Sequence, residues 1–166
     1  MVGDEVARLI PRDMDVPSGV ETESFRIRPI TIHDTFKDYD AVMTSVDYLR
    51  GRLFDSPGWP SHDLTLIQDM IDLAWHQKEG QLRRSFAFAV MSLDESVQLG
   101  CLYIDPPSKE GIDAEVSMWV RASEANTGLD AELYETVRRW VDDEWPFDRV
   151  AYPGREYTRA EWDDLP

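Results

Sequence analysis

The spacing of apolar residues along the chain changes several times, and each spacing predicts a type of element. Over residues 24–31, apolar residues alternate with arginines, so a half-buried strand is expected. Over residues 31–53, apolar residues recur at intervals of three and four, which predicts a helix capped by Thr31 or Asp34. The same criteria predict further helices over 63–79 and 129–145 and further strands over 84–93, 97–105, 112–122 and 147–154.

The two later helices are both amphipathic. The helix over 129–145 ends at Pro146, and its apolar stripe is formed by Leu133, Val137, Trp140 and Val141. The helix over 63–79 carries on one face Leu64, Ile67, Met70, Ile71, Ala74 and Trp75.

The order of these elements, β-α-α-β-β-β-α-β, predicts an α+β domain with a mixed sheet. The strands over 84–93 and 97–105 are separated by the short sequence DES, which is typical of a hairpin. A helix joins the strand 112–122 to the strand 147–152, and a right-handed crossover would make these two strands parallel. The chain divides into an N-terminal arm (1–24), one domain (25–154) and an acidic C-terminal tail (155–166).

Charge narrows the range of partners. With 33 acidic and 17 basic residues, the net charge is −16, which disfavours nucleic acid because such binding depends on lysine and arginine. The charge serves solubility or favours a cationic small molecule. No apolar run is long enough to cross a bilayer and the first residues do not resemble a signal peptide, so a cytoplasmic protein without membrane contact is expected.

Two residue types indicate little chemistry. The three histidines lack the spacing of metal ligands, so no metal site is expected. The single cysteine, Cys101, falls in an apolar strand, and we expect it to be buried and inert.

The sequence VRASEANTGLDAEL (120–133) runs from a strand through a polar loop into a helix. Backbone N–H groups at such a junction bind phosphate, because the helix dipole favours an anion there. Asp130 lies in the first helical turn, where a carboxylate would repel that anion. Two alternatives remain: the carboxylate complements its own helix, in a near-capping box with Thr127, or its side chain turns aside from a working phosphate site.

Four sequences in this order resemble the GNAT superfamily of acyl-CoA-dependent N-acyltransferases. They are FRIRPITIHD from residue 25, AEVSMWV from 114, Gly128 followed by Leu129 and Leu133, and FDRVAY from 147. The resemblance covers residues 25–152. Of the family's three loop positions only Gly128 is kept, since Ala125 and Asp130 replace the other two. The family's final helix and two strands are missing after Tyr152.

The resemblance implies a GNAT-like fold and transfer of an acetyl group from acetyl-CoA to a primary amine of a small molecule or peptide. The acceptor would be cationic if the negative charge of the protein attracts it. Implied cofactor contacts are backbone groups of Val120 and Arg121 for pantetheine and of Asn126, Thr127, Gly128, Leu129, Asp130 and Ala131 for the pyrophosphate. Glu115 is the candidate general base, and Tyr152 or Tyr157 would protonate the leaving thiolate.

The departures from the family pattern leave other hypotheses open. One is a catalytically inactive GNAT-like module for binding or interaction, and another is an unrelated α+β interaction domain. The short C-terminus also suggests that the N-terminal arm or a second subunit completes the sheet, which predicts a homodimer in the second case.

Overall fold

The computed structural model describes residues 7–166, and residues 1–6 of the N-terminal arm lie outside this range. Within it, one sheet contains the strands β1 (Val20–Glu21), β2 (Arg26–Pro29), β3 (Phe86–Met91), β4 (Gln98–Asp105), β5 (Ala114–Val120) and β6 (Val150–Ala151). The α-helices are α1 (Thr35–Met43), α2 (Val46–Leu49), α3 (Leu66–Gln81), α4 (Leu129–Glu144) and α5 (Arg159–Asp163), and two short 3-10 helices are η1 (Ile32–Asp34) and η2 (Ala122–Glu124).

The strands follow one another across the sheet in chain order. Each pair from β1 to β5 is antiparallel, and β6 returns parallel to β5 after α4. These observations confirm the predicted hairpin and the parallel crossover. The α+β architecture with a mixed sheet is therefore as expected from the sequence.

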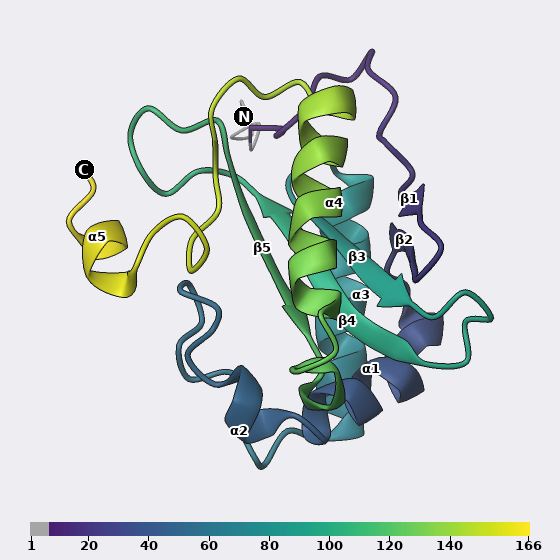
Figure 1. The fold of residues 1–166 in the computed structure, drawn as a ribbon. Helices are drawn as coiled ribbons and strands as arrows, with labels where there is room; N and C mark the ends of the chain where they lie inside the picture. Colours follow the sequence, from purple (N-terminus) through teal and green to yellow (C-terminus); the bar gives the residue numbers. More distant parts are fainter. Residues whose placement is uncertain (1–6) are drawn as a thin grey trace, which may run out of the picture.

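Helices cover the two faces of the sheet (Figure 1). One face packs against α4, and the other packs against α1 and α3. The period of two along β5 divides its side chains between these layers: Met118 and Val120 face α4, whereas Trp119 faces α1 and α3. The α4 stripe is buried as its spacing predicts, with Leu133 and Val137 fully covered.

The helix α3 is turned differently from what its amphipathic pattern indicates. An apolar helix face normally packs on the core, yet Ile67, Ile71 and Trp75 are each more than half exposed. The residues that α3 buries are Asp69 and Leu73. An acidic side chain therefore takes a position in the interior while the apolar stripe faces solvent.

The described part of the N-terminal arm, residues 7–24, and the C-terminal segment are both attached to the domain. The arm contributes β1, which pairs with β2 at the edge opposite β6, so it does not complete the sheet beside β6. Residues 155–166, assigned to a tail by the sequence, contain α5, which begins with a capping box of Thr158 and Glu161. Trp162 of α5 is 6% exposed, so this segment is folded against the domain.

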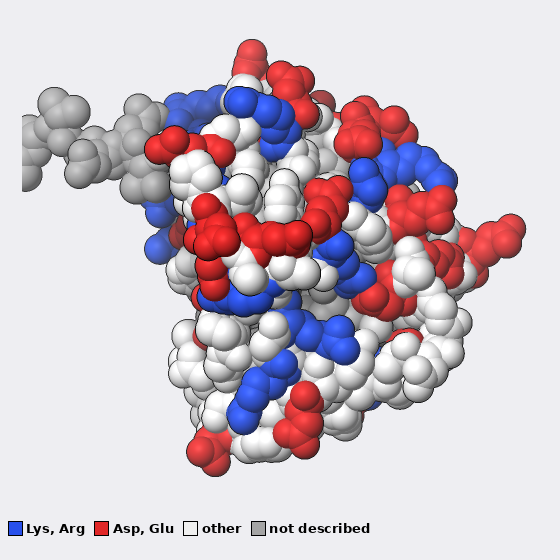
Figure 2. All heavy atoms as spheres, turned by 60° about the vertical axis from the view of Figure 1, so that its left-hand side comes forward, with Lys and Arg blue, Asp and Glu red and all other residues white. Residues whose placement is uncertain are grey.

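The surface carries both signs of charge. Figure 2 shows the side that includes the C-terminal segment, with basic side chains through its middle and lower part among acidic ones. This face is thus less uniformly acidic than the net charge of −16 implies. Among the helices of residues 7–166, none combines the length and apolar character needed to span a membrane.

Candidate functional site

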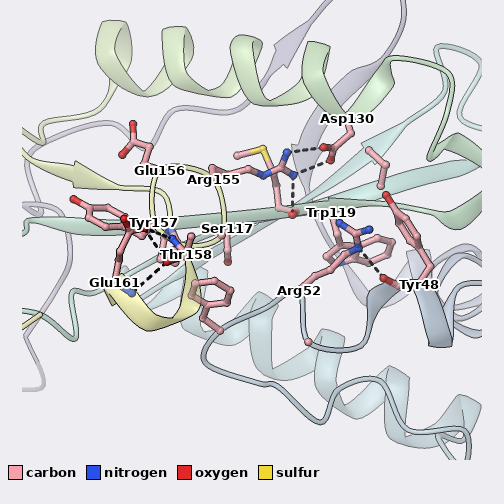
Figure 3. A pocket seen from close by; sticks show the side chains of 16 residues that line it. Tyr48, Arg52, Ser117, Trp119, Asp130, Arg155, Glu156, Tyr157, Thr158 and Glu161 are labelled. Atoms are coloured by element: carbon pink, nitrogen blue, oxygen red, sulfur yellow. Dashed lines mark hydrogen bonds and ion pairs between the residues drawn. The ribbon is translucent and has the colours of Figure 1, made fainter. Parts of the chain in front are cut away.

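The strands β5 and β6 separate shortly after they meet. Their pairing consists of Ala114 with Val150 and Glu115 with Ala151. From there to Val120, β5 has no partner on the β6 side. A cavity of about 500 Å³ lies where they part, and we call it the cleft cavity. It is lined by the outer half of β5, the start of α4, the loop after α2 and the segment 153–161 (Figure 3).

The first turn of α4 offers free backbone donors to this region. Gly128 precedes the helix with φ of 86°, a left-handed conformation that glycine adopts without strain. The amide of Leu129 donates to Thr127 Oγ1 at 3.3 Å. Within residues 7–166, the amides of Asp130 and Ala131 have no hydrogen-bond partner. They are therefore available to an anion at the positive end of the helix.

The side chain of Asp130 is turned away from these amides. Both of its carboxylate oxygens accept hydrogen bonds from Arg155, at 2.6 and 2.7 Å, as Figure 3 shows. The near-capping box expected between Thr127 and Asp130 does not form, and the carboxylate is turned aside to Arg155. The working phosphate site of the second alternative stays a prediction. Because the ion pair is bidentate, Arg155 neutralises the carboxylate beside the helix terminus.

Arg155 also crosses the gap between the separated strands. Its Nη2 atom lies 3.3 Å from the carbonyl oxygen of Met118 on β5. Since β6 does not reach this part of β5, the arginine satisfies a carbonyl that would otherwise face the cavity.

The structure distinguishes the two residues expected to bind pantetheine through their backbones. Val120 lines the cleft cavity. Arg121 does not: its amide donates to Leu99, its carbonyl accepts from Glu124 and its guanidinium pairs with Asp40. Of the predicted pyrophosphate residues, Asp130 lines the cavity, whereas Asn126, Thr127, Gly128, Leu129 and Ala131 form the loop and helix start beside it.

Glu115, the candidate base, holds a loop in place. One of its carboxylate oxygens accepts from the hydroxyl of Ser108 at 2.6 Å and from the amide of Ser108. It lines a third cavity of about 250 Å³, together with Asp105 and Ser117.

The two candidate tyrosines lie in different environments. Tyr152 is 3% exposed, packs edge-on against Tyr134 at 5.5 Å in the core under α4, and burial raises the pKa of its hydroxyl. That hydroxyl has no hydrogen-bond partner within residues 7–166. Tyr157 lines the cleft cavity, so it has the access that a proton donor to a thiolate there would need.

A second cavity, of about 320 Å³, lies on the α1 and α3 side of the sheet, and we call it the acidic cavity. Its lining includes five aspartates: Asp38, Asp55, Asp69, Asp72 and Asp105. Within the described residues, no lysine or arginine lines it. Asp38 and Asp69 are 4% and 3% exposed, and burial raises the pKa of both, that of Asp69 to about 6.

Ser117 connects the cavities, because it lines the cleft cavity, the acidic cavity and the third cavity. Ser117 pairs with Tyr103 on the adjacent strand β4. Asp105 follows Tyr103 by two residues and therefore lies on the same face of the sheet. Burial, with the charges of Asp55 and Glu115, raises the pKa of Asp105 to about 7. A carboxyl group with this pKa, open to two of the cavities, is suited to accept a proton near neutral pH.

Several of these residues had no signal in the sequence. Arg155 lies 25 positions beyond Asp130 in a segment without a motif. Asp38 and Asp69 occur in helices where an acidic residue normally indicates a solvent-facing position. Within residues 7–166, no group of His, Cys, Asp and Glu side chains is arranged to hold a metal ion.

Comparison of the sequence with protein-family models and with curated proteins finds no match. Solved structures do match. A protein from Bordetella pertussis described as a GNAT-family acetyltransferase superposes with a TM-score of 0.62 at 14% identity, over 82% of this chain and 77% of its own. The ribosomal-protein-S5-alanine acetyltransferase of Vibrio fischeri gives 0.57 at 16% identity, over 88% and 78%.

A third match is the microcin C7 self-immunity acetyltransferase MccE, solved in complex with acetyl-CoA and AMP. It gives a TM-score of 0.63 at 11% identity, over 82% of this chain and 73% of its own. The chain therefore has the fold of the GNAT acetyltransferases, as the resemblance in its sequence predicts.

Proposed function

We propose that the protein is an N-acetyltransferase that moves an acetyl group from acetyl-CoA to an amine. The observation that carries this proposal is the cleft cavity, which begins where β5 parts from β6 and extends to Asp130 in the first turn of α4, beside the free amides. Such a cavity suits a molecule with an anionic diphosphate at one end and an extended amide-containing arm at the other.

The residues present fit acetyl-CoA as a substrate. The unpaired amides of Asp130 and Ala131 would bind the diphosphate, and the guanidinium groups of Arg52 and Arg155, both in the cavity lining, would add positive charge. The exposed backbone of β5 around Met118 and Val120 would pair with the amides of the pantetheine arm. Arg155 would release the Met118 carbonyl as that arm enters.

Acetyl transfer would then take place near Ser117, where the cavities meet. The acceptor ammonium gives one proton to the carboxylate of Asp105, and the neutral nitrogen attacks the thioester carbon. The new C–N bond forms as the C–S bond breaks, and the proton that the nitrogen then loses ends on the sulfur through the hydroxyl of Tyr157. In this scheme Asp105 takes the role expected of Glu115, and Tyr157, rather than Tyr152, is the one of the two candidate tyrosines that donates the proton.

Calorimetric titration of acetyl-CoA into the protein tests the first step. Asp130→Asn removes a negative charge beside the diphosphate and releases Arg155, so we expect the dissociation constant to fall about threefold to tenfold. Arg155→Met leaves the Asp130 carboxylate unneutralised, so we expect weaker binding by a similar factor. Glu135→Gln is the matched control, because it removes one charge from the exposed face of α4.

Release of free thiol in the presence of amines tests the second step. No binding of acetyl-CoA at millimolar concentration would overturn the proposal, and so would equal effects of Asp130→Asn and Glu135→Gln.

The position of Arg155 favours the non-catalytic alternative. Its guanidinium already occupies the opening beside β5. If the protein is such a module, acetyl-CoA does not bind to it and no free thiol is released. The Arg155→Met variant would still fold in that case. The cationic acceptor, the cytoplasmic location and the homodimer remain predictions.

A further inference from the structure

The residues that line the acidic cavity favour a cationic ligand. Its five aspartates come from different parts of the chain: α1, the loop after α2, α3 and the end of β4. Its volume of about 320 Å³ is at the lower end of the range for small-molecule sites, about 300–1,000 Å³. The fold thus brings distant carboxylates around a space that a small molecule can fill.

Asp69 shows that this cluster is more than a solvated acidic surface. It is 97% buried, lines the cavity, and its Oδ2 atom has no hydrogen-bond partner within residues 7–166. A buried carboxylate oxygen without a partner is costly, and native structures rarely leave one unpaired. Asp69 also shares a hydrogen bond with Asp38, so the two buried carboxyl groups hold a proton between them, and a cationic ligand of the cavity would replace that proton.

Two arginines of the neighbouring elements are bound elsewhere. Arg28 pairs with Asp34 and Glu95, and Arg121 pairs with Asp40. The amide of Gln98 donates to Asp38, which supplies a hydrogen bond but no positive charge. His76 lines the cavity, and burial lowers its pKa, so it is neutral at pH 7. Within the described residues, the lining therefore supplies no positive charge to its carboxyl groups.

Aromatic rings complete the site. His76 stands between Trp75 and Tyr103, with ring centres 5.2 and 5.4 Å apart, and all three line the cavity. Trp59 lines it as well and packs against Trp119 at 5.8 Å. Aromatic faces attract ammonium groups and also pack against methylene chains. Carboxylates and rings together suit an amine with an aliphatic chain.

The acidic groups are spread along the length of the cavity. Asp38 lies at the level of Cys101 on β4, with 3.8 Å between its Oδ1 and the thiol sulfur. Asp105 lies four residues further along the strand, which corresponds to about 13 Å. A ligand that meets both needs positive charges at separated points rather than a single charge.

We propose that the acidic cavity binds a linear aliphatic polyamine, with one ammonium group at Asp38 and Asp69 and another near Asp105 and Ser117. The terminal nitrogen beside Ser117 would be the one acetylated, and this part of the inference rests on the proposed function. Binding itself requires only the cavity and its charges, so it can be measured without acetyl-CoA.

Calorimetry with spermidine, butane-1,4-diamine and butylamine as probes tests the site. We expect the triamine to bind most tightly, the diamine less tightly and the monoamine at least tenfold more weakly than the triamine. Asp69→Asn, nearly the same size as aspartate, should raise the dissociation constant of the triamine about tenfold. Asp63→Asn makes the same change of charge at an exposed position outside the cavity and should leave binding unchanged.

Circular dichroism and melting temperature establish that both variants are folded, and Asp38→Asn provides a second variant with the same expected loss. The inference is overturned if millimolar triamine gives no heat, if the monoamine binds as tightly as the triamine, or if Asp63→Asn weakens binding as much as Asp69→Asn. Triamine binding without thiol release from acetyl-CoA would support the site and reject the proposed acetyl transfer.

Discussion

Asp69 carries a charge in the interior of the protein, and its titration is coupled to folding. Burial raises its pKa from 3.8 to about 6, the charge of Asp72 on the same helix acts in the same direction, and Asp38 on α1 opposes it. Between about pH 4 and pH 6 the folded protein holds a proton that the unfolded chain has lost. Stability therefore falls as pH rises through this range.

We predict that Asp69→Asn stabilises the protein more at pH 7.5 than at pH 4.5, because the variant has no charge to desolvate. The gain in unfolding free energy should differ between the two pH values by about 1–2 kcal/mol. Urea denaturation at both pH values measures it. Asp63→Asn, at an exposed position, should show no such difference, and an equal gain for Asp69→Asn at both pH values would contradict the explanation.

At the scale of elements, the site depends on how closely β4 pairs with β5. Gly100 of β4 lies opposite Val120, and a Cβ atom there would lie 2.0 Å from the Trp119 carbonyl oxygen and 3.1 Å from the Val120 Cα. These contacts are with backbone, which cannot move without shifting the strand. A side chain at this position would push β5 away at the end that lines the cleft cavity.

We predict that Gly100→Ala costs about 2–3 kcal/mol of unfolding free energy, because overpacking against backbone is not relieved by side-chain rotation. Gly58→Ala is the matched control: its Cβ would meet nothing within 4 Å, so the variant should be neutral or slightly stabilised. Chemical denaturation of both variants measures the difference. Equal stabilities would show that the strands separate more easily than the structure indicates.

At the scale of the whole molecule, charge is arranged rather than spread evenly. The net charge is −16, yet the side with the C-terminal segment presents basic groups among the acidic ones (Figure 2), and the acidic cavity has no lysine or arginine among its described lining. The proposed anionic and cationic substrates would thus meet surfaces of different character.

This arrangement predicts how salt affects polyamine binding. Raising the salt from about 0.05 M to about 0.3 M shortens the range of electrostatic attraction, so the dissociation constant of spermidine should rise several-fold and that of butylamine much less. Calorimetric titrations at the two salt concentrations measure this. Equal changes for the two amines would indicate that the protein attracts them only through its overall charge.

The sequence determined the order of the elements, the two amphipathic helices, the parallel crossover and the position of the loop at Gly128 that precedes α4. These follow from spacing and turn residues within short stretches, where period and backbone preference act locally. The resemblance in the strands then indicated the GNAT fold.

Tertiary structure alone decided which residues meet. Arg155 neutralises Asp130 because the chain beyond β6 returns across β5, and Asp69 enters the interior because α3 turns its apolar stripe to solvent. The acidic cavity exists because α1, α3 and β4 converge around it. Such contacts join segments far apart in the chain, so no local pattern encodes them, and the chemistry of the site depends on them most.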